Sequence, residues 1–492
     1  MLFRWLHVPL DVHSPAPSAR HSALAMAGSI AQSVSRFVVN WLIGRLGGPS
    51  LLGQAASTIA FAQLLTLVGP TSIGVALTRE LANARGQKDL ELLEARAAHL
   101  SRRSWQVLPL LSVIALFAWR AGGNSWTTGL AAASLVMGYS LYNITRGKLY
   151  GLGRLRRSAL WDLGTSVALI LLVAVAIALF GARLEILFAV AAVYVLYSLM
   201  NTSGHRGVHA KTSGTDRFVI IDLVGTVASA GFLQVSILAS RHWGGEIGSG
   251  HYSAAFSLAL PVSLLVRSAT QVLYPRLAVD SGASAGDRAA VHASAFATVM
   301  AAIIPLALGL IGLLGPQIVP VLWGDQYRAA VAPLQIIIVG LTLAGVATAS
   351  VSLMTVTSAR TQAVATALSI VGALIGAAVW LFAGESWGIL GVAAGYSAGA
   401  GAIAIGCMIF AQVRLGALMG PTLVRALLQL GIFGGLCVWT STADHAGTPV
   451  YASGLFTAIS ATLWMIPLRQ LRGRHRLAPR DNQSETRPEA MN

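Results

Sequence analysis

The chain is poor in charged residues and nearly free of cysteine. Asp, Glu, Lys and Arg make up 11% of its 492 residues, whereas soluble proteins contain about 25%. This shortage, together with a hydrophobic content of 55%, excludes an ordinary soluble domain and indicates that much of the apolar surface faces lipid. Both cysteines, Cys407 and Cys437, fall inside apolar stretches, so no disulfide framework is expected.

The sequence also lacks the motifs that bind ATP or a catalytic zinc ion. No phosphate-binding loop of the form G-x-x-x-x-G-K-[ST] is present, since the nearest candidate at 210–212 lacks both glycines. His205 and His209 have no glutamate between them of the zinc-protease type, and we interpret them as basic loop residues. We therefore expect no cofactor, no metal site and no catalytic residue, in a protein that is not an enzyme.

What the sequence does contain is a series of long apolar stretches separated by short polar gaps. Most stretches reach the ~20 residues that a helix needs to cross a hydrocarbon layer of ~30 Å. We predict an all-α polytopic membrane protein with about fourteen transmembrane helices. The predicted spans are residues 21–44, 52–77, 104–119, 126–145, 159–181, 184–203, 218–240, 252–274, 291–314, 331–355, 362–383, 387–411, 422–441 and 449–468.

Basic residues gather in every second gap. Of the 34 lysines and arginines, 27 fall on one side of the predicted membrane, five fall on the other and two lie inside predicted spans. Arginine strongly outnumbers lysine, which is typical of a GC-rich bacterial genome. The positive-inside rule then predicts that both termini are cytoplasmic. Together with the arginine bias and the resemblance described below, this gives a bacterial plasma (inner) membrane as the expected location. Anionic headgroups explain the net charge of +16, so no nucleic-acid partner is expected. The opposite gaps contain only Arg45, Arg120, Arg183, Arg241 and Arg328.

An internal repeat relates two parts of the chain. A shift of 197 residues (244 − 47) places residues 47–53 on 244–250 and Arg79 on Arg276. The shift spans six predicted helices, and an even number predicts a parallel repeat about an axis along the membrane normal. The predicted segments are an N-lobe at 1–213 (spans 1–6), a C-lobe at 214–415 (spans 7–12), spans 13–14 at 416–470, and a basic, disordered cytoplasmic tail at 471–492.

The gap at 78–103 mixes charged and apolar side chains, which favours a helix lying along the cytoplasmic interface in a structural role. Pro70, Pro261 and Pro305 lie inside predicted spans and permit bends. Asp162 lies at the end of a predicted span, where we expect it to pair with a nearby arginine.

Two arginines inside predicted spans are the candidate site residues. Arg36 shares a helical face with Gln32 and Asn40, and a lipid-facing helix would not carry such a polar stripe. We interpret this face as the wall of a water-accessible cavity; the alternative is that Arg36 snorkels to the outer interface. Arg267 in span 8, with Gln271 one turn further, is the counterpart, and its alternative is to reach cytoplasmic headgroups. A cavity with a guanidinium and few carboxylates favours an anion such as phosphate.

Four motifs, in this order, resemble those of a known family. They are LGGPSLLG at 46–53, TRGKLYGLGR at 145–154, the segment from GHYSAAF to QVLYPRL at 250–277, and LWGDQY at 322–327. The set is similar to the lipid-linked oligosaccharide (polysaccharide biosynthesis) flippases of the multidrug/oligosaccharidyl-lipid/polysaccharide exporter (MOP) superfamily, over about residues 20–470.

This resemblance implies two six-helix lobes around a cationic cavity and alternating access. It further implies that Arg36 and Arg267 hold the diphosphate of a polyprenyl-diphosphate-linked oligosaccharide while it moves from the cytoplasmic to the outer leaflet, for cell-surface polysaccharide biosynthesis. The expected partners are the lipid bilayer and the lipid-linked glycan, with a polysaccharide polymerase or glycosyltransferases as candidate protein partners.

Three other functions stay open on the sequence. A multidrug or other small-molecule exporter of the same superfamily would need carboxylates for proton or sodium coupling, which the predicted spans lack at mid-depth. A membrane-embedded glycosyltransferase or ligase would need acidic residues and a long outer loop, and the outer gaps are short. The third is a scaffold without transport activity.

Overall fold

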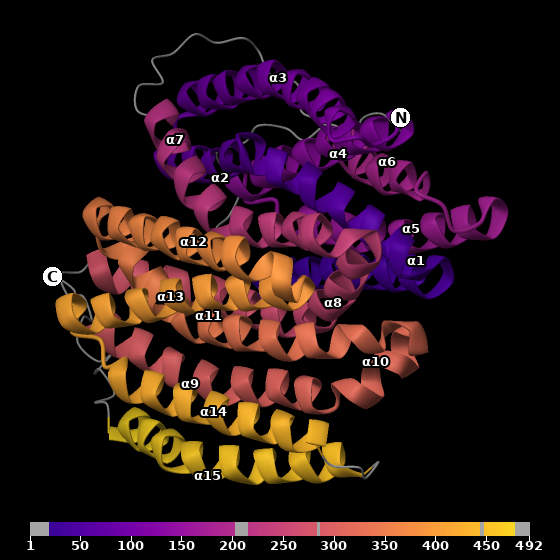
Figure 1. The fold of residues 1–492 in the computed structure, drawn as a ribbon. Helices are drawn as coiled ribbons and strands as arrows, with labels where there is room; N and C mark the ends of the chain where they lie inside the picture. The colour runs from indigo at the N-terminus through magenta and orange to yellow at the C-terminus, as the bar shows by residue number, and fades with distance from the viewer. Residues whose placement is uncertain (1–18, 202–214, 283–285, 443–446, 478–492) are drawn as a thin grey trace, which may run out of the picture.

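In the computed structural model of the chain, the regular elements are helices packed side by side (Figure 1). The structure describes residues 19–201, 215–282, 286–442 and 447–477, and no strand occurs in these ranges. Ten helices among them are long and apolar enough to cross a membrane. The predicted all-α, polytopic membrane fold with about fourteen helices is confirmed.

Short connections join most of the helices. In chain order the elements are α1 (Ala19–Leu67), α2 (Pro70–Gly86), α3 (Leu90–Ala121), α4 (Trp126–Gly151), α5 (Leu155–Phe180), α6 (Ile186–Leu199), α7 (Thr215–Thr226), the π-helical turn η2 (Val227–Gly231), α8 (Phe232–Gly282), α9 (Gly286–Leu313), α10 (Gly315–Trp323), the 3-10 turn η3 (Asp325–Ala330), α11 (Val331–Thr357), α12 (Ala359–Trp387), α13 (Ile389–Leu415), α14 (Gly420–Thr442) and α15 (Thr448–Leu477).

The two longest helices, α1 and α8, are each two helices joined at a glycine. Gly48 in α1 has a φ of 77° and Gly245 in α8 has a φ of 64°, a backbone conformation that glycine adopts without a steric penalty. A straight helix of the 49 residues in α1 would be about 74 Å long, far more than the ~30 Å hydrocarbon layer. The kinks therefore divide each long helix into two lengths that fit the membrane.

The two kinked segments touch through their backbones. A Cβ atom on Gly53 would lie 1.9 Å from the carbonyl oxygen of Glu246, and a Cβ atom on Gly250 would lie 1.9 Å from the carbonyl oxygen of Pro49. Pro49 and Glu246 are themselves related by the 197-residue shift (246 − 49). The two contacts are thus one contact with the repeats exchanged, and glycine is needed at both positions because the backbones approach so closely.

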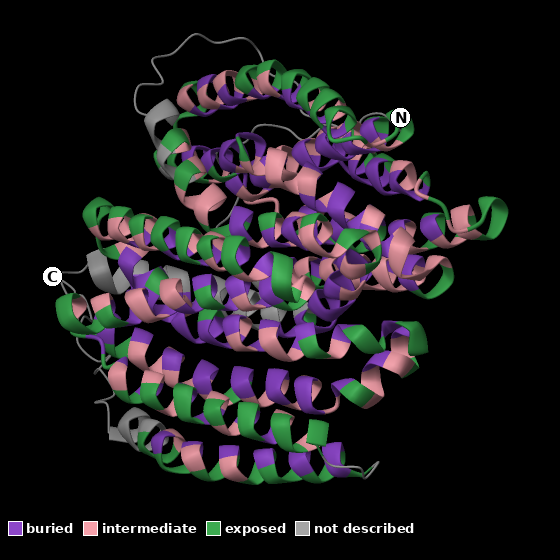
Figure 2. Cartoon of the chain, in the orientation of Figure 1, coloured by how far each residue is buried: buried purple, intermediate pink, exposed green. Residues whose placement is uncertain are grey.

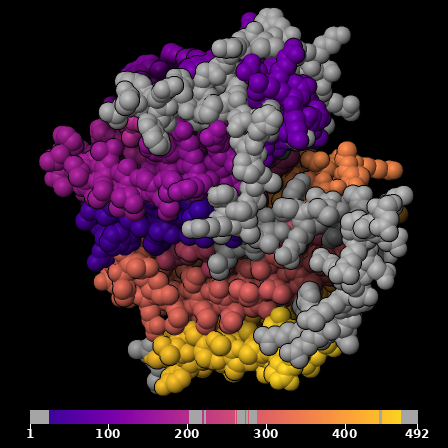
Figure 3. Space-filling model, turned by 180° about the vertical axis from the view of Figure 1, so that it is seen from behind, coloured from indigo at the N-terminus to yellow at the C-terminus, as the bar shows by residue number. Residues whose placement is uncertain are grey.

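The remaining helices form groups around α1 and α8. Helix α1 packs on α4 and α5, helix α11 packs on α8, α9 and α13, and α14 and α15 pack on α9. Figure 1 shows α14 and α15 at one edge of the stack, and Figure 3 shows the same edge in yellow from behind. The lobe boundaries at 213 and 415 stay a prediction, and the first lies outside the described residues. Helix α15 reaches Leu477, so it includes the first seven residues of the segment predicted as a disordered tail.

The outward surface of the bundle is apolar. Leu171, Leu374, Phe382 and Val438 are all exposed, and exposed residues follow the outward faces of α3, α12 and α14 in Figure 2. An apolar surface of this extent is not tolerated by a monomeric protein in water, whereas acyl chains solvate it well. The chain is accordingly a multi-pass membrane protein.

The prediction of one continuous span at 52–77 is wrong. Helix α1 ends at Leu67 and α2 begins at Pro70, because proline lacks the backbone N–H that an uninterrupted helix would use. Pro305 is different: it lies inside α9 without ending it.

The interfacial helix predicted at 78–103 is also corrected by the structure. The segment is shared between the end of α2 and the start of α3, which continues without a break to Ala121. The Asp89 side chain accepts a hydrogen bond from the Leu92 backbone N–H at 2.9 Å, and this N-cap starts α3 at Leu90, so the charged residues from Glu91 to Arg103 belong to α3 itself.

Candidate functional site

The polar residues predicted to share one face of α1 lie in two environments. Ser33, Arg36 and Asn40 line a cavity, whereas Gln32 is buried against α5. Arg36 precedes the kink at Gly48 by about 18 Å along the helix axis, which is close to the middle of a ~30 Å layer. Its side chain therefore lies at mid-depth and faces the cavity, not the end of the bundle.

The cavity lies between α1 and α8, with α4, α5 and α6 completing its wall. Its volume is about 350 Å³. Arg36 is the single charged residue of the described lining, which contains no carboxylate. The other polar lining residues besides Tyr139 are Ser33, Asn40, Gln63, Gln234, Ser253 and Ser257.

Arg36 is held by tyrosines and not by a carboxylate. Its Nε donates to the Tyr194 hydroxyl at 3.0 Å, and its guanidinium carbon lies 5.6 Å from the ring centroids of both Tyr139 and Tyr194. Such cation–π contacts contribute about 0.5–2 kcal/mol each, which offsets part of the cost of a charge at this depth. Within the described ranges Arg36 forms no ion pair and its terminal amino groups have no acceptor, so its charge is available to a ligand.

Gln32 lies behind the cavity and supports Tyr194. Its side-chain nitrogen donates to Thr165 Oγ1 at 2.7 Å and to the Asp162 carbonyl at 3.1 Å, while its Oε1 accepts from the Tyr194 hydroxyl at 3.4 Å. The sequence predicts Gln32 as a ligand-binding residue, and the structure corrects this placement. Position on a helical stripe does not fix how α1 is rotated against α5, and that rotation turns Gln32 away from the cavity.

A second buried arginine nearby is neutralised. Arg146 Nε lies 3.2 Å from the Asp162 carboxylate, whose side chain is 0% exposed, and Tyr142 donates to the same carboxylate at 2.9 Å. The predicted pairing of Asp162 with an arginine is confirmed, although the pair is buried within the bundle. The ion pair of Asp162 is with Arg146 and not with Arg36.

The predicted counterpart of Arg36 in the second repeat cannot be compared with it. Arg267 and Gln271 belong to α8, but their side chains fall outside the described residues. Their participation stays a prediction. The described contribution of α8 to the polar lining is Gln234, Ser253 and Ser257.

The sequence analysis missed this α8 contribution and the tyrosines around Arg36. Ser253 and Ser257 are four residues apart, which places them on one helical face, so the signal was present in the sequence. Tyr139 and Tyr194 carried no such signal, because their approach to Arg36 depends on how α4 and α6 pack against α1.

A polar cluster joins α1 to α8 next to the kinks. The Glu246 carboxylate accepts hydrogen bonds from Ser50 at 3.0 Å and Gln54 at 2.6 Å, and Arg241 lies 3.3 Å from it. We name Arg241, Glu246, Ser50 and Gln54 the kink-end clamp. Together with the glycine contacts, the kink-end clamp holds the two repeats together at this end of the cavity.

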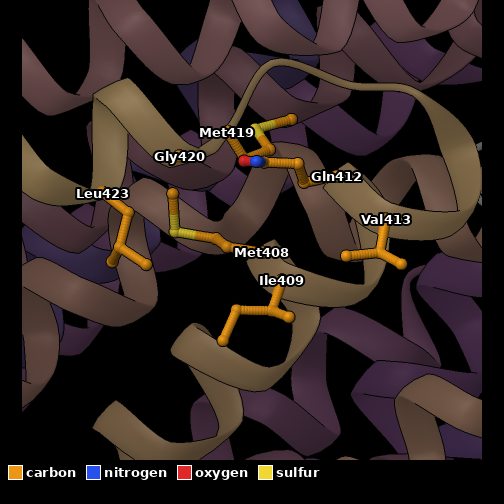
Figure 4. Close-up of a pocket in the computed structure, with 7 residues that line it drawn as sticks. All are labelled: Met408, Ile409, Gln412, Val413, Met419, Gly420 and Leu423. Carbon is orange, nitrogen blue, oxygen red and sulfur yellow. The ribbon is translucent and has the colours of Figure 1, made fainter.

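Two further pockets are mainly apolar. One, of about 680 Å³, lies between α9 and α15. The other, of about 150 Å³, lies where α13 meets α14; Figure 4 shows Met408 and Met419 on its wall and Gln412 at its rim. Neither pocket contains a charged lining residue. The described part of the chain also contains no cluster of metal-ligating side chains, so the cavity between α1 and α8 is the candidate site.

Solved structures with the same arrangement of helices are transporters. An inward-facing conformation of a multidrug resistance MATE family transporter of the MOP superfamily matches with a TM-score of 0.62 and 17% identity, over 80% of this chain and 98% of that chain. An outward-facing conformation of such a transporter matches with a TM-score of 0.58 and 17% identity, over 81% of this chain and 94% of that chain.

A third similar structure is a MOP superfamily transporter from Pyrococcus furiosus, whose binding pocket has a reverse polarity that suggests a different function. It has a TM-score of 0.60 and 18% identity, over 81% of this chain and 95% of that chain. No family model matches the sequence, and no curated protein matches it. At these identities the comparison establishes the fold: the chain has the all-helical, MATE-like fold of the MOP superfamily transporters.

Proposed function

We propose that the protein moves an anionic amphiphile across the bacterial inner membrane by alternating access, and that its cargo is a polyprenyl-diphosphate-linked oligosaccharide. The observation that carries this proposal is the uncompensated charge of Arg36 in a cavity whose other polar groups are neutral. A planar guanidinium binds phosphate oxygens through two parallel, charge-assisted hydrogen bonds. Arg36 would therefore hold the diphosphate, and Arg267 is the candidate for the same role in the second repeat.

The proposed direction is from the cytoplasmic to the outer leaflet, with the kinks on the outer side. The support is the sequence: the predicted gaps on the kink side contain few arginines, as outer loops do under the positive-inside rule. The lipid tail would stay among acyl chains during transport, because moving each CH₂ group into water costs about 0.8 kcal/mol. Only the polar head then needs the shelter of the cavity.

A multidrug exporter is the second candidate, because similar solved structures are multidrug resistance transporters. The charge of the cavity argues against a cationic drug, since the described lining offers Arg36 and no carboxylate. The transporter from Pyrococcus furiosus supports the view that pocket polarity differs among proteins of this fold and suggests different functions.

A vesicle assay separates the two candidates. The purified protein is reconstituted with a fluorescent polyprenyl-diphosphate-linked sugar or with a cationic dye, and translocation of each is measured. We expect the wild-type protein to translocate the glycolipid. Arg36→Ala should lower the translocation rate at least about tenfold, as the loss of one charge-assisted hydrogen bond implies, and Arg36→Lys should give a rate between the two. Arg328→Ala, at a surface pair, is the matched control. Dye transport without glycolipid transport would favour the multidrug exporter.

A further inference from the structure

Two serines of α8 that face the cavity, Ser253 and Ser257, differ from Ser236 and Ser240 of the same helix in their hydrogen bonds. Ser236 and Ser240 donate their hydroxyl hydrogens to carbonyls of their own helix three residues back, each at 2.7 Å. Ser253 is 3% exposed, and its hydroxyl has no hydrogen-bond partner in the described structure. Ser257 accepts a bond from Asn40 at 3.3 Å but donates to no described group. Both hydroxyl donors thus remain available at the cavity wall.

Two amides complete this group. The Asn40 side-chain amide uses one N–H for its long bond to Ser257, and the oxygen of the same amide accepts a hydrogen bond from no described donor. Gln234 lines the same cavity, and its side chain has no hydrogen bond to a described residue. Asn40 lies one helical turn beyond Arg36, about 6 Å along the axis. The group therefore offers neutral donors and acceptors directly beside the positive charge.

We infer that Asn40, Gln234, Ser253 and Ser257 form a subsite for a neutral, hydroxyl-bearing group, the first sugar of the cargo, next to the anion site at Arg36. This inference rests on the proposed function, because it assigns a sugar to the cargo. The hydroxyls of a hexose or N-acetylhexosamine both donate and accept, as the subsite does. An ammonium or carboxylate group would find no counter-charge among these side chains, and an apolar group would leave the buried hydroxyls unpaired at a cost in free energy.

The subsite also joins the two repeats, since Asn40 comes from α1 and the other three residues come from α8. The bond between Asn40 and Ser257 is a contact between these helices inside the cavity. A sugar hydroxyl placed between the two side chains would replace that contact with contacts to the cargo. Binding of the glycan would thereby weaken one link between the repeats.

The binding of three probes tests the subsite, because each of two sugar-bearing lipids is compared with the bare lipid diphosphate. The full chain in nanodiscs is titrated with geranylgeranyl diphosphate, and with the same lipid carrying glucose or N-acetylglucosamine on the diphosphate. We expect at least one sugar to tighten binding about tenfold, and the double variant S253A/S257A to remove most of that gain while leaving the affinity for the bare diphosphate unchanged. Two neutral hydrogen bonds account for an effect of this size. The variant should fold, because Ser253 loses no existing bond and Ser257 loses only the 3.3 Å bond from Asn40.

The matched control is S236A/S240A, which changes two buried serines at the same spacing on the same helix, away from the cavity lining. No gain from either sugar in the wild type, or a gain that S253A/S257A leaves intact, would overturn the subsite. Arg36→Ala is measured separately and should weaken binding of all probes alike. If Arg36→Ala leaves the affinity for all probes unchanged while S253A/S257A removes the gain from the sugar, the proposed anion site is wrong and the sugar subsite is supported.

Discussion

Replacing Asp162 with asparagine should destabilise the protein far more than neutralising a surface ion pair. The Asp162 carboxylate is 0% exposed and lies 3.2 Å from Arg146 Nε, and it accepts a further bond from Tyr142 at 2.9 Å. Asparagine keeps the shape but removes the charge, which leaves Arg146 with the hydroxyls of Ser29 and Tyr150 as neutral partners. Removing one partner of a buried pair costs about 3–5 kcal/mol.

The chain supplies its own control for this experiment. Arg328 and Asp325 form a pair at 2.9 Å whose side chains are 74% and 79% exposed, so Asp325→Asn should cost less than about 1 kcal/mol. Thermal unfolding of the two variants in the same detergent gives the comparison. Adding Arg146→Leu to Asp162→Asn should recover part of the lost stability, because the unpaired charge is then removed. Equal unfolding temperatures for the two single variants, or no recovery in the double variant, would refute the reasoning.

Three further predictions concern the cavity and the contact between the repeats. Tyr194→Phe removes the hydroxyl that accepts a hydrogen bond from Arg36 Nε at 3.0 Å. We expect it to weaken the binding of the diphosphate severalfold in a titration, while the unfolding temperature of the protein changes little. Gly53→Ala places a Cβ atom 1.9 Å from the Glu246 carbonyl and should lower the yield of folded protein on size-exclusion chromatography; Gly434→Ala, with nothing within 4 Å of its Cβ, should not. Glu246→Gln weakens the kink-end clamp and should speed maleimide labelling of a cysteine introduced at Ala56, which lines the cavity between α1 and α8. Unchanged labelling would show that the kink-end clamp does not limit access to the cavity.

The fold class was predictable because lipid constrains composition more strongly than water does. Apolar stretches and alternating arginines sufficed for the helical class. The repeated glycines around 47–53 and 244–250 fell in gaps predicted between separate spans, where the structure has kinks within α1 and α8. Apolarity reports exposure to lipid, however, and not the continuity of a helix. The break before Pro70 and the early start of α3 behind Asp89 depend on local backbone chemistry, and both were misplaced.

The candidate site was predictable only in part, and for a related reason. A charge on an apolar helix identified Arg36 and Asn40 from α1 alone. The partners of Arg36 could not be found in this way, because Tyr139 and Tyr194 are ordinary tyrosines in the sequence of their own helices. The shared face of Ser253 and Ser257 follows from their spacing in the sequence. That their hydroxyls lack an acceptor could not be predicted, because it depends on how α8 packs on α1.

The distribution of ion pairs in the structure is compatible with the alternating access proposed above. The buried pair of Arg146 and Asp162 joins α4 to α5 within the first repeat, and breaking it is costly, so these helices should move as one body. The pair that belongs to the kink-end clamp joins the repeats through its Ser50 and Gln54 contacts, and its Arg241 and Glu246 side chains are 23% and 40% exposed. A contact so exposed to solvent contributes less than about 1 kcal/mol, and two states that differ by only a few kcal/mol both stay populated. In the proposed transporter, a strong ion pair inside one repeat and exposed polar contacts between the repeats would allow the cavity to change the side on which it opens without unfolding either half.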